Sequence, residues 1–118
     1  MSKDPATRDE LATALEQLSQ QAEHLAEMGR DVFCSSSMEG QIARLAACQI
    51  VIQLQAVVED LPSGVMTRLE HLPLREVRGM RNRLAHGYGT IDPAMLWATI
   101  ADALPEFVVM VREELLAD

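Results

Sequence analysis

The sequence contains very few aromatic residues: two Phe, one Tyr and one Trp, or 3% of 118 residues. Its core must therefore be aliphatic, and a hydrophobic fraction of 48% that includes seven Met can supply one. Sandwiches and barrels depend on aromatic and β-branched residues, so this composition disfavours them and favours packed helices. At this length we expect a single domain over residues 1–118.

Cysteines are also scarce, and long apolar runs are missing. Cys34 and Cys48 match no metal-ligand spacing, and we expect both to be reduced thiols. We find no apolar run of the roughly 18 residues that a membrane span needs. No cationic start followed by an apolar block suggests a signal peptide. The sequence therefore predicts a cytoplasmic protein that does not enter a membrane.

Positive charge is in short supply, with ten Lys and Arg against eighteen Asp and Glu, a net charge of −8. This excess of negative charge argues against indiscriminate binding of nucleic acid or anionic membrane over the whole surface. Half of the basic residues nevertheless gather within sixteen positions, where only two glutamates oppose them. They are Arg68, Arg75, Arg78, Arg81 and Arg83. This cationic cluster on an acidic chain is the feature that suggests chemistry.

Apolar residues recur in steps of four and three between Ala6 and about Met28, which predicts a long amphipathic helix. They are Leu11, Leu15, Leu18, Ala22 and Leu25. Gly29 is expected to close this helix in the left-handed conformation. We expect His24 to be a partly exposed residue beside the apolar seam.

Residues 30–35 are interpreted as a connection with Val32 and Phe33 tucked beneath it. Ser36 and Glu39 have the spacing of a capping box, which would open a second helix running to about Leu61. That helix is apolar on most sides, so it should be central or should also face a partner chain. Its surplus apolar surface is a first indication of a dimer.

After a break at residues 62–64, residues 65–72 offer one or two helical turns. Pro73 suits the first turn of a third helix, which would end at His86 before Gly87. Together with the C-terminal region, these stretches predict an all-α, antiparallel four-helix up-and-down bundle with an extra short helix.

Asp92 followed by Pro93 predicts the start of the fourth helix, with an N-cap and a first-turn proline. Pro105 should kink or split that helix, because it lacks an N–H and its ring clashes with the carbonyl of Ala101.

The end of the third helix brings Arg81, Asn82, His86 and Tyr88 within eight residues. A guanidinium binds phosphate through two parallel hydrogen bonds. An imidazole exchanges protons near neutral pH, and a tyrosine hydroxyl can orient a phosphate or accept a modifying group. No second histidine or carboxylate stands at ligand spacing, so we expect chemistry without a metal or cofactor.

A purely structural interpretation is also open. A histidine near a helix C-terminus meets the helix dipole favourably and can cap carbonyl groups. A tyrosine after Gly87 can simply staple the helix end, and arginines along a helix commonly form a solvated face. Spacing alone does not decide between these alternatives.

The order Arg81, four residues, His86, one residue, Tyr88 resembles the R-x4-H-x-Y motif of the HepT-like branch of the HEPN superfamily. The similarity extends over most of the chain, including Leu61-Pro62, the helix opened by Pro73, and Leu104-Pro105. Two positions depart from the family pattern. Leu54-Gln55 replaces a Gly-Glu pair, which removes a carboxylate that could border the site, and Leu74 replaces a Trp.

The resemblance implies a homodimer in which two copies of the motif face each other across a cleft and cleave RNA without a metal. His86 would act as general acid or base, Arg81 would stabilise charge on the phosphate, and Asn82 and Tyr88 would position the reacting groups. Single-stranded RNA is the expected substrate. The phosphodiester backbone of the RNA would be bound by the neighbouring arginines Arg75, Arg78 and Arg83.

The resemblance also implies a toxin whose antitoxin is a minimal nucleotidyltransferase, in a complex that can grow beyond the dimer. That partner would transfer nucleotide to Tyr88 (AMPylation), which would fill and neutralise the cationic cleft. Two alternatives remain. The chain could be a non-catalytic nucleotide- or substrate-binding subunit of such a nucleotidyltransferase, or a dimeric scaffold with a vestigial site.

Overall fold

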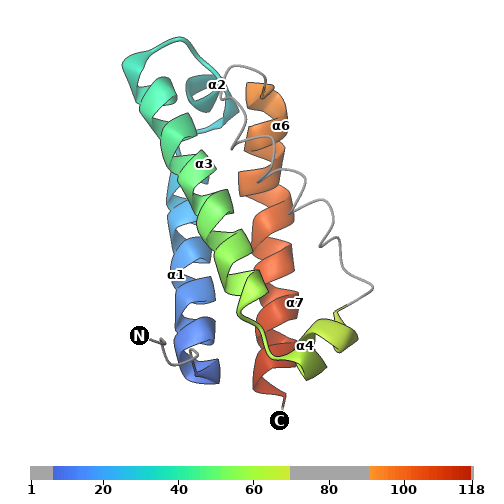
Figure 1. Cartoon of the computed structure of the whole chain (residues 1–118). Helices are drawn as coiled ribbons and strands as arrows, with labels where there is room; N and C mark the ends of the chain where they lie inside the picture. The colour runs from blue at the N-terminus through green and yellow to red at the C-terminus, as the bar shows by residue number, and fades with distance from the viewer. Residues whose placement is uncertain (1–6, 70–90, 118) are drawn as a thin grey trace, which may run out of the picture.

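The computed structural model describes residues 7–69 and 91–117. These two ranges contain helices and no strand, which confirms the predicted all-α class (Figure 1). The predicted third helix, from Pro73 to His86, lies outside the described residues. The helices are α1 (Arg8–Ala26), α2 (Arg30–Phe33), α3 (Met38–Glu59), α4 (Ser63–Arg68), α6 (Pro93–Ala98), the π-helical η2 (Thr99–Ala103) and α7 (Leu104–Leu116).

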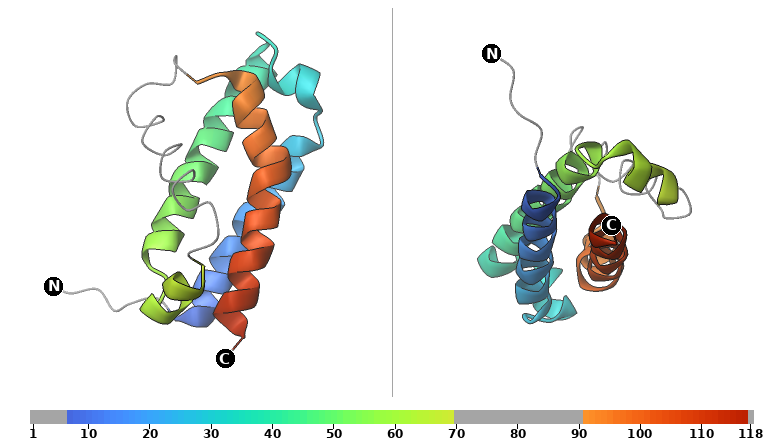
Figure 2. Two further views of the ribbon diagram at one scale, coloured as in Figure 1. Left: turned by 90° about the vertical axis from the view of Figure 1, so that its right-hand side faces the viewer. Right: turned by 90° about the horizontal axis from the view of Figure 1, so that it is seen from below.

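The long helices lie side by side, and α1 runs in the direction opposite to that of both α3 and α7 (Figures 1 and 2). Helix α1 packs against both α3 and α7, while α2 and α6 meet at one end of the bundle and α4 contacts α7 at the other. Leu69, which caps α4, and Ile91, which precedes α6, therefore lie at opposite ends.

Helix α1 follows the predicted seam. The Thr7 side chain accepts a hydrogen bond from the Glu10 backbone N–H at 3.1 Å, which caps the helix. Four seam residues are buried and Leu25 is half-buried. The helix ends at Ala26, earlier than expected, and Gly29 instead precedes α2 with φ 85° and ψ 153°. This backbone conformation favours glycine, but it is not the left-handed helical one that we expected.

The connection after α1 contains a helical turn, α2. It buries Phe33 beneath it as expected, whereas Val32 is only half-buried. The Phe33 ring lies 5.3 Å from that of Trp97, measured between centroids. The predicted capping residue Ser36 was wrong by one position. Ser37 is the N-cap of α3, and its Oγ accepts from the Gly40 N–H at 3.0 Å. Ser35 holds Ser37 in place, because their hydroxyl oxygens lie 2.6 Å apart.

The fourth predicted helix begins as expected, with the Asp92 carboxylate accepting from the Ala94 N–H at 3.0 Å and Pro93 in the first turn. It is not split at Pro105. The backbone widens into the π-helical turn Thr99–Ala103 just before the proline, and the Leu104 N–H donates to the Thr99 carbonyl, five residues earlier. The extra residue per turn accommodates the proline within one continuous helix.

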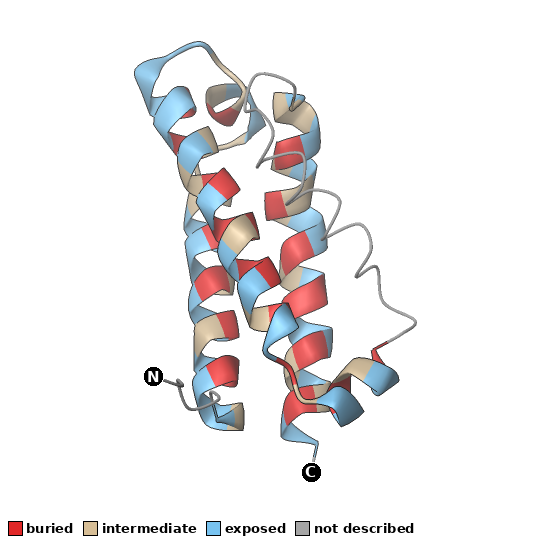
Figure 3. Ribbon diagram, viewed as in Figure 1, coloured by how far each residue is buried: buried red, intermediate tan, exposed pale blue. Residues whose placement is uncertain are grey.

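The core lies between α1, α3 and α7 and is aliphatic apart from Phe33, Phe107 and Cys48 (Figure 3). Helix α3 is apolar beyond its buried face. Met38, Ile42 and Leu45 are 66%, 58% and 57% exposed, so the predicted surplus of apolar surface is present.

Two helices, Met38–Glu59 and Pro93–Leu116, are long and apolar enough to cross a membrane by length and composition. This differs from the expectation that the chain lacks such a stretch. Within the apolar windows of these helices, 44% and 33% of the residues are buried inside the bundle. The core helices of a bundle meet the same criteria, so length and composition are weak support for a span.

The first and last described helices are joined at one end of the bundle. The Arg8 guanidinium donates to the Leu115 carbonyl oxygen at 2.8 Å. Further along the same pair of helices, Arg112 lies 3.4 Å from the Glu16 carboxylate.

Candidate functional site

All the residues that the sequence marks as a site lie outside the described ranges. They are Arg75, Arg78, Arg81, Asn82, Arg83, His86 and Tyr88. Their roles therefore remain predictions from the sequence. The structure instead describes the residues on either side of this segment, up to Leu69 and from Ile91 onward, and the surface of the rest of the bundle.

At one end, Arg68 is the first arginine of the cationic cluster. Its Nε lies 2.8 Å from a Glu114 carboxylate oxygen, and its Nη2 donates to the Glu114 carbonyl oxygen at 2.9 Å. Arg68 thus joins α4 to α7. Its charge is already paired, which leaves phosphate binding to the other arginines of the cluster.

At the other end, Ile91 borders a hollow of about 230 Å³ between α3 and α6. Arg44 lines it, but its Nη1 donates to the carbonyl oxygens of Phe33 and Ser35 at 2.5 and 2.8 Å. Cys48 also lines it, and burial raises the pKa of the Cys48 thiol, which keeps it protonated near neutral pH. We therefore assign this hollow no acid–base or nucleophilic role.

Gln55, which stands where the family pattern has a glutamate, is buried in α3, with 2% of its surface exposed. Its Nε2 donates to the Glu59 carboxylate at 3.1 Å, while its Oε1 has no hydrogen-bond partner among the described residues. Burying a carboxylate costs more than burying a neutral amide. Gln55 therefore suits this interior position, and its spacing from Val51 and Val58 is the sequence signal that could have revealed the burial.

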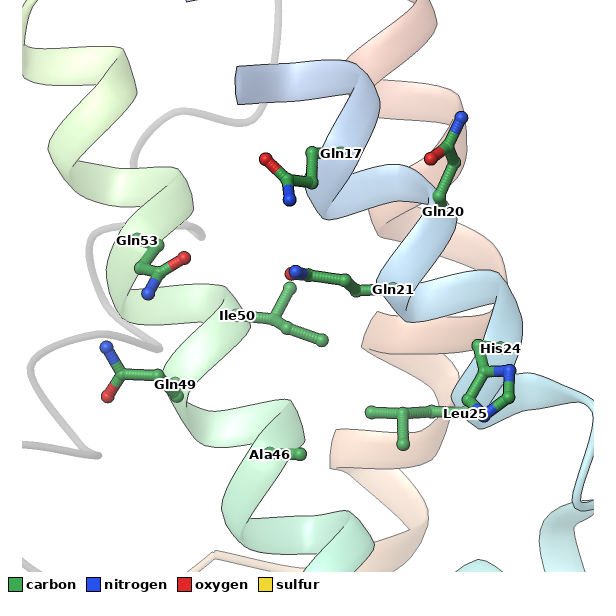
Figure 4. A pocket seen from close by; sticks show the side chains of 9 residues that line it. All are labelled: Gln17, Gln20, Gln21, His24, Leu25, Ala46, Gln49, Ile50 and Gln53. Atoms are coloured by element: carbon green, nitrogen blue, oxygen red, sulfur yellow. The ribbon is translucent and has the colours of Figure 1, made fainter. Parts of the chain in front are cut away.

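A glutamine-lined groove between α1 and α3 was not foreseen. Gln17 and Gln21 extend from α1 toward α3, and Ala46 and Ile50 line its α3 side (Figure 4). The groove holds about 560 Å³. None of its five glutamines hydrogen-bonds with another described residue. His24 is exposed at its edge, in agreement with the sequence expectation.

The described residues contain no group of three or more His, Cys, Asp or Glu that could hold a metal ion. The described ranges contain five arginines and fourteen acidic residues. Four of these arginines make hydrogen bonds to protein oxygens. The described surface is thus strongly acidic, while residues 70–90 carry four arginines and two glutamates.

Residues 14–114 match the protein family described as Ribonuclease HepT-like. The chain belongs to this HepT-like family. The match covers most of the chain and contains the whole stretch from Arg81 to Tyr88. The resemblance inferred from the motif is therefore confirmed at the level of the family.

Individual relatives of this HepT-like chain are distant. A protein of Caldanaerobacter subterraneus subsp. tengcongensis named "Putative RNase" is 26% identical over 99 residues, which cover 84% of this chain and 88% of that protein. Two Methanocaldococcus jannaschii proteins also carry that name. One is 23% identical over a match that covers 65% of this chain and 66% of that protein. The other is 33% identical over a match that covers 42% of this chain and 40% of that protein. No solved structure matches the chain.

Proposed function

We propose that this HepT-like protein is an endoribonuclease that cleaves single-stranded RNA without a metal ion. The observation that carries the proposal is the family match over residues 14–114, which contains an intact R-x4-H-x-Y motif. The relatives named as RNases support the same activity class.

In the proposed reaction, the ribose 2′-hydroxyl attacks the adjacent phosphorus atom and the 5′-oxygen leaves. His86 takes the proton from the 2′-hydroxyl or gives one to the leaving oxygen. Arg81 stabilises the negative charge that develops on the phosphate, and Asn82 and Tyr88 position the phosphate or the imidazole. These steps require only proton transfer and stabilisation of negative charge, and the residues of the motif can supply both.

The distribution of charge supports RNA binding at the motif segment. Arg8, Arg44, Arg68 and Arg112 are engaged with protein oxygens, so they contribute little to an anion-binding surface. The acidic remainder of the bundle repels a phosphodiester backbone, whereas the arginines of residues 70–90 attract it. RNA should therefore be directed to the segment that holds His86.

We further propose that the protein is a cytoplasmic toxin that acts as a homodimer and is inhibited by a minimal nucleotidyltransferase. Nucleotide transfer to Tyr88 would add a bulky anionic group to the cationic cleft. Such a group would exclude RNA sterically and electrostatically. The proposal rests on the family membership and on Tyr88 at the third motif position.

The deciding experiment compares the wild-type protein with His86→Ala on total RNA in excess EDTA. We expect cleavage by the wild type and none by the variant. Mass spectrometry of the same sample must show an unmodified Tyr88. Absence of cleavage by an unmodified wild-type dimer would contradict the nuclease proposal and favour a nucleotide- or substrate-binding subunit.

A further inference from the structure

Helices α6 and α7 form one continuous helix with the π-helical turn η2 between them (Figure 1). The two parts of this helix pack on different neighbours. Helix α6 contacts α2 and α3, whereas α7 contacts α1 and α4. The rotation of α6 about the common axis therefore has to suit a second set of partners, and η2 lies where that rotation can change.

The buried residues on either side of η2 show how large the change is. Leu96 and Leu104 are both 2% exposed. They lie eight positions apart, and eight residues of a regular α-helix overshoot two full turns by about 80°. In a regular helix, Leu96 would therefore point well to one side of the core face on which Leu104 and Val108 lie.

In a regular α-helix, Trp97 would take the core position instead. It stands seven positions before Leu104, and seven residues complete two turns to within about 20°. In the structure Trp97 is only half-buried, and its ring lies 5.3 Å from that of Phe33 in α2. One extra residue rotates α6 by about 100°, which brings Leu96 into the core and Trp97 to Phe33.

We propose that η2 contains one extra residue that sets the rotation of α6, and that the packing of α6 on α2 and α3 maintains it. Pro105 by itself does not explain the turn. A proline requires only that its bond to the carbonyl of Ala101 be absent, and a simple kink would achieve this as well. The burial of Leu96 beside Leu104 requires a rotation, and the extra residue supplies it.

This inference goes beyond the proposed function, and it concerns the point at which the chain rejoins the bundle after the motif segment. Ile91 is the first described residue after Tyr88, and it directly precedes the Asp92 cap of α6. Ile91 and Leu96 line the same hollow between α3 and α6. A rotation of α6 by one residue would move both of them relative to α3, so the extra residue fixes this re-entry point.

The test removes the extra residue from the full-length chain. Deletion of the exposed Ala103 together with Pro105→Ala allows α6 and α7 to join as a regular α-helix, with Leu96 seven positions before Leu104. We expect this double variant to keep the wild-type urea midpoint and the wild-type emission maximum of Trp97, the only tryptophan. A nuclear Overhauser effect between the rings of Trp97 and Phe33 should persist.

Two controls make the result specific. Deletion of Val109 removes a residue of α7 that is 55% exposed, but no π-helical turn is there to absorb the loss. The residues after it would rotate by about 100° out of the core, so the urea midpoint should fall clearly. Pro105→Ala alone should keep the Trp97 emission and the ring contact, because packing still requires the turn.

Three outcomes would overturn the proposal. A shifted emission or a lost ring contact in Pro105→Ala would show that the proline maintains the turn. Loss of the ring contact in the double variant would show that η2 does not contain a single extra residue. A midpoint in the double variant as low as that of the Val109 deletion would show the same. None of these measurements depends on nuclease activity.

Discussion

Gly40 of α3 lies directly against the backbone of Val32 in α2. A Cβ atom added at Gly40 would stand 2.5 Å from the Val32 carbonyl oxygen and 2.9 Å from that of Ser35. Both neighbours are backbone atoms that cannot turn away as a side chain would. Glycine is therefore required here by close approach, in the first turn of the central helix.

Gly40→Ala should consequently destabilise the protein by about 1–3 kcal/mol, because the added methyl group forces the α2–α3 junction apart. Urea unfolding followed by circular dichroism measures this change. Gly64→Ala is the matched control, since its Cβ would approach only the end of the Arg68 side chain at 3.9 Å. That variant should be neutral or gain up to about 1 kcal/mol. Equal effects in the two variants would contradict the packing described.

Ser37→Ala should lower the unfolding free energy by about 1 kcal/mol, because it removes the hydroxyl that caps the Gly40 N–H. Ser36→Ala should have almost no effect, since no hydrogen bond joins its side chain to a described residue. Parallel urea titrations distinguish the two serines. A larger loss in Ser36→Ala would restore the capping box that the sequence first suggested.

Alkaline pH should destabilise the fold through Cys48. Burial raises the pKa of this thiol above its ordinary value of 9.0, so the unfolded chain ionises first. Its contribution is therefore intact below pH 9.0 and declines as the pH rises toward the folded-state pKa. The difference in unfolding free energy between the wild type and Cys48→Ala should shrink above that pH. Cys34→Ala serves as the control for removal of a thiol that is only half-buried.

Removal of an arginine from the motif segment should weaken RNA binding in a salt-dependent way. In a His86→Ala background, each of Arg75→Ala, Arg78→Ala and Arg83→Ala should reduce the slope of log K against log salt by about 0.7. Fluorescence anisotropy with a labelled single-stranded RNA measures the slope. Arg30→Ala in α2 is the control, because this exposed arginine lies outside the cluster. An equal change in the control would mean that binding is spread over the surface.

Cleavage should depend on the ribose 2′-hydroxyl. An RNA oligonucleotide with a single 2′-deoxy nucleotide at the mapped cleavage position should resist the wild-type protein, because the attacking oxygen is gone. The unmodified oligonucleotide and one with the deoxy nucleotide two positions away are the controls. Cleavage of the deoxy-substituted bond would show that water, and not the 2′-hydroxyl, attacks the phosphate.

The parts of the fold that the sequence predicts well are those set by local chemistry. The apolar seam of α1 and the Asp92-Pro93 start of α6 each depend on residues within one or two turns. The error at Ser36 and the absence of a split at Pro105 have a different origin. Ser37 becomes the cap because Ser35 fixes the preceding loop, and Pro105 is accommodated by a π-helical turn that no spacing rule indicates.

For the candidate site, the sequence predicts the motif but not the groove between α1 and α3. The motif from Arg81 to Tyr88 was identified by its resemblance to the HepT-like pattern, because spacing alone left a purely structural role open, and the family match covers this stretch. The glutamine-lined groove was not, because Gln17 and Gln53 are ordinary polar residues on separate helices. Only the packing of α1 against α3 brings them together.

The hydrogen bond from Arg8 to the Leu115 carbonyl bears on whether the helices need their present order along the chain. It places the start of the first helix next to the end of the last one. A short linker could therefore join the two ends, and new termini could be opened in the serine-rich loop before α3. Such a circular permutant would keep the bundle while separating α1 from α3 in the sequence, and its folding would show that their adjacency along the chain is dispensable.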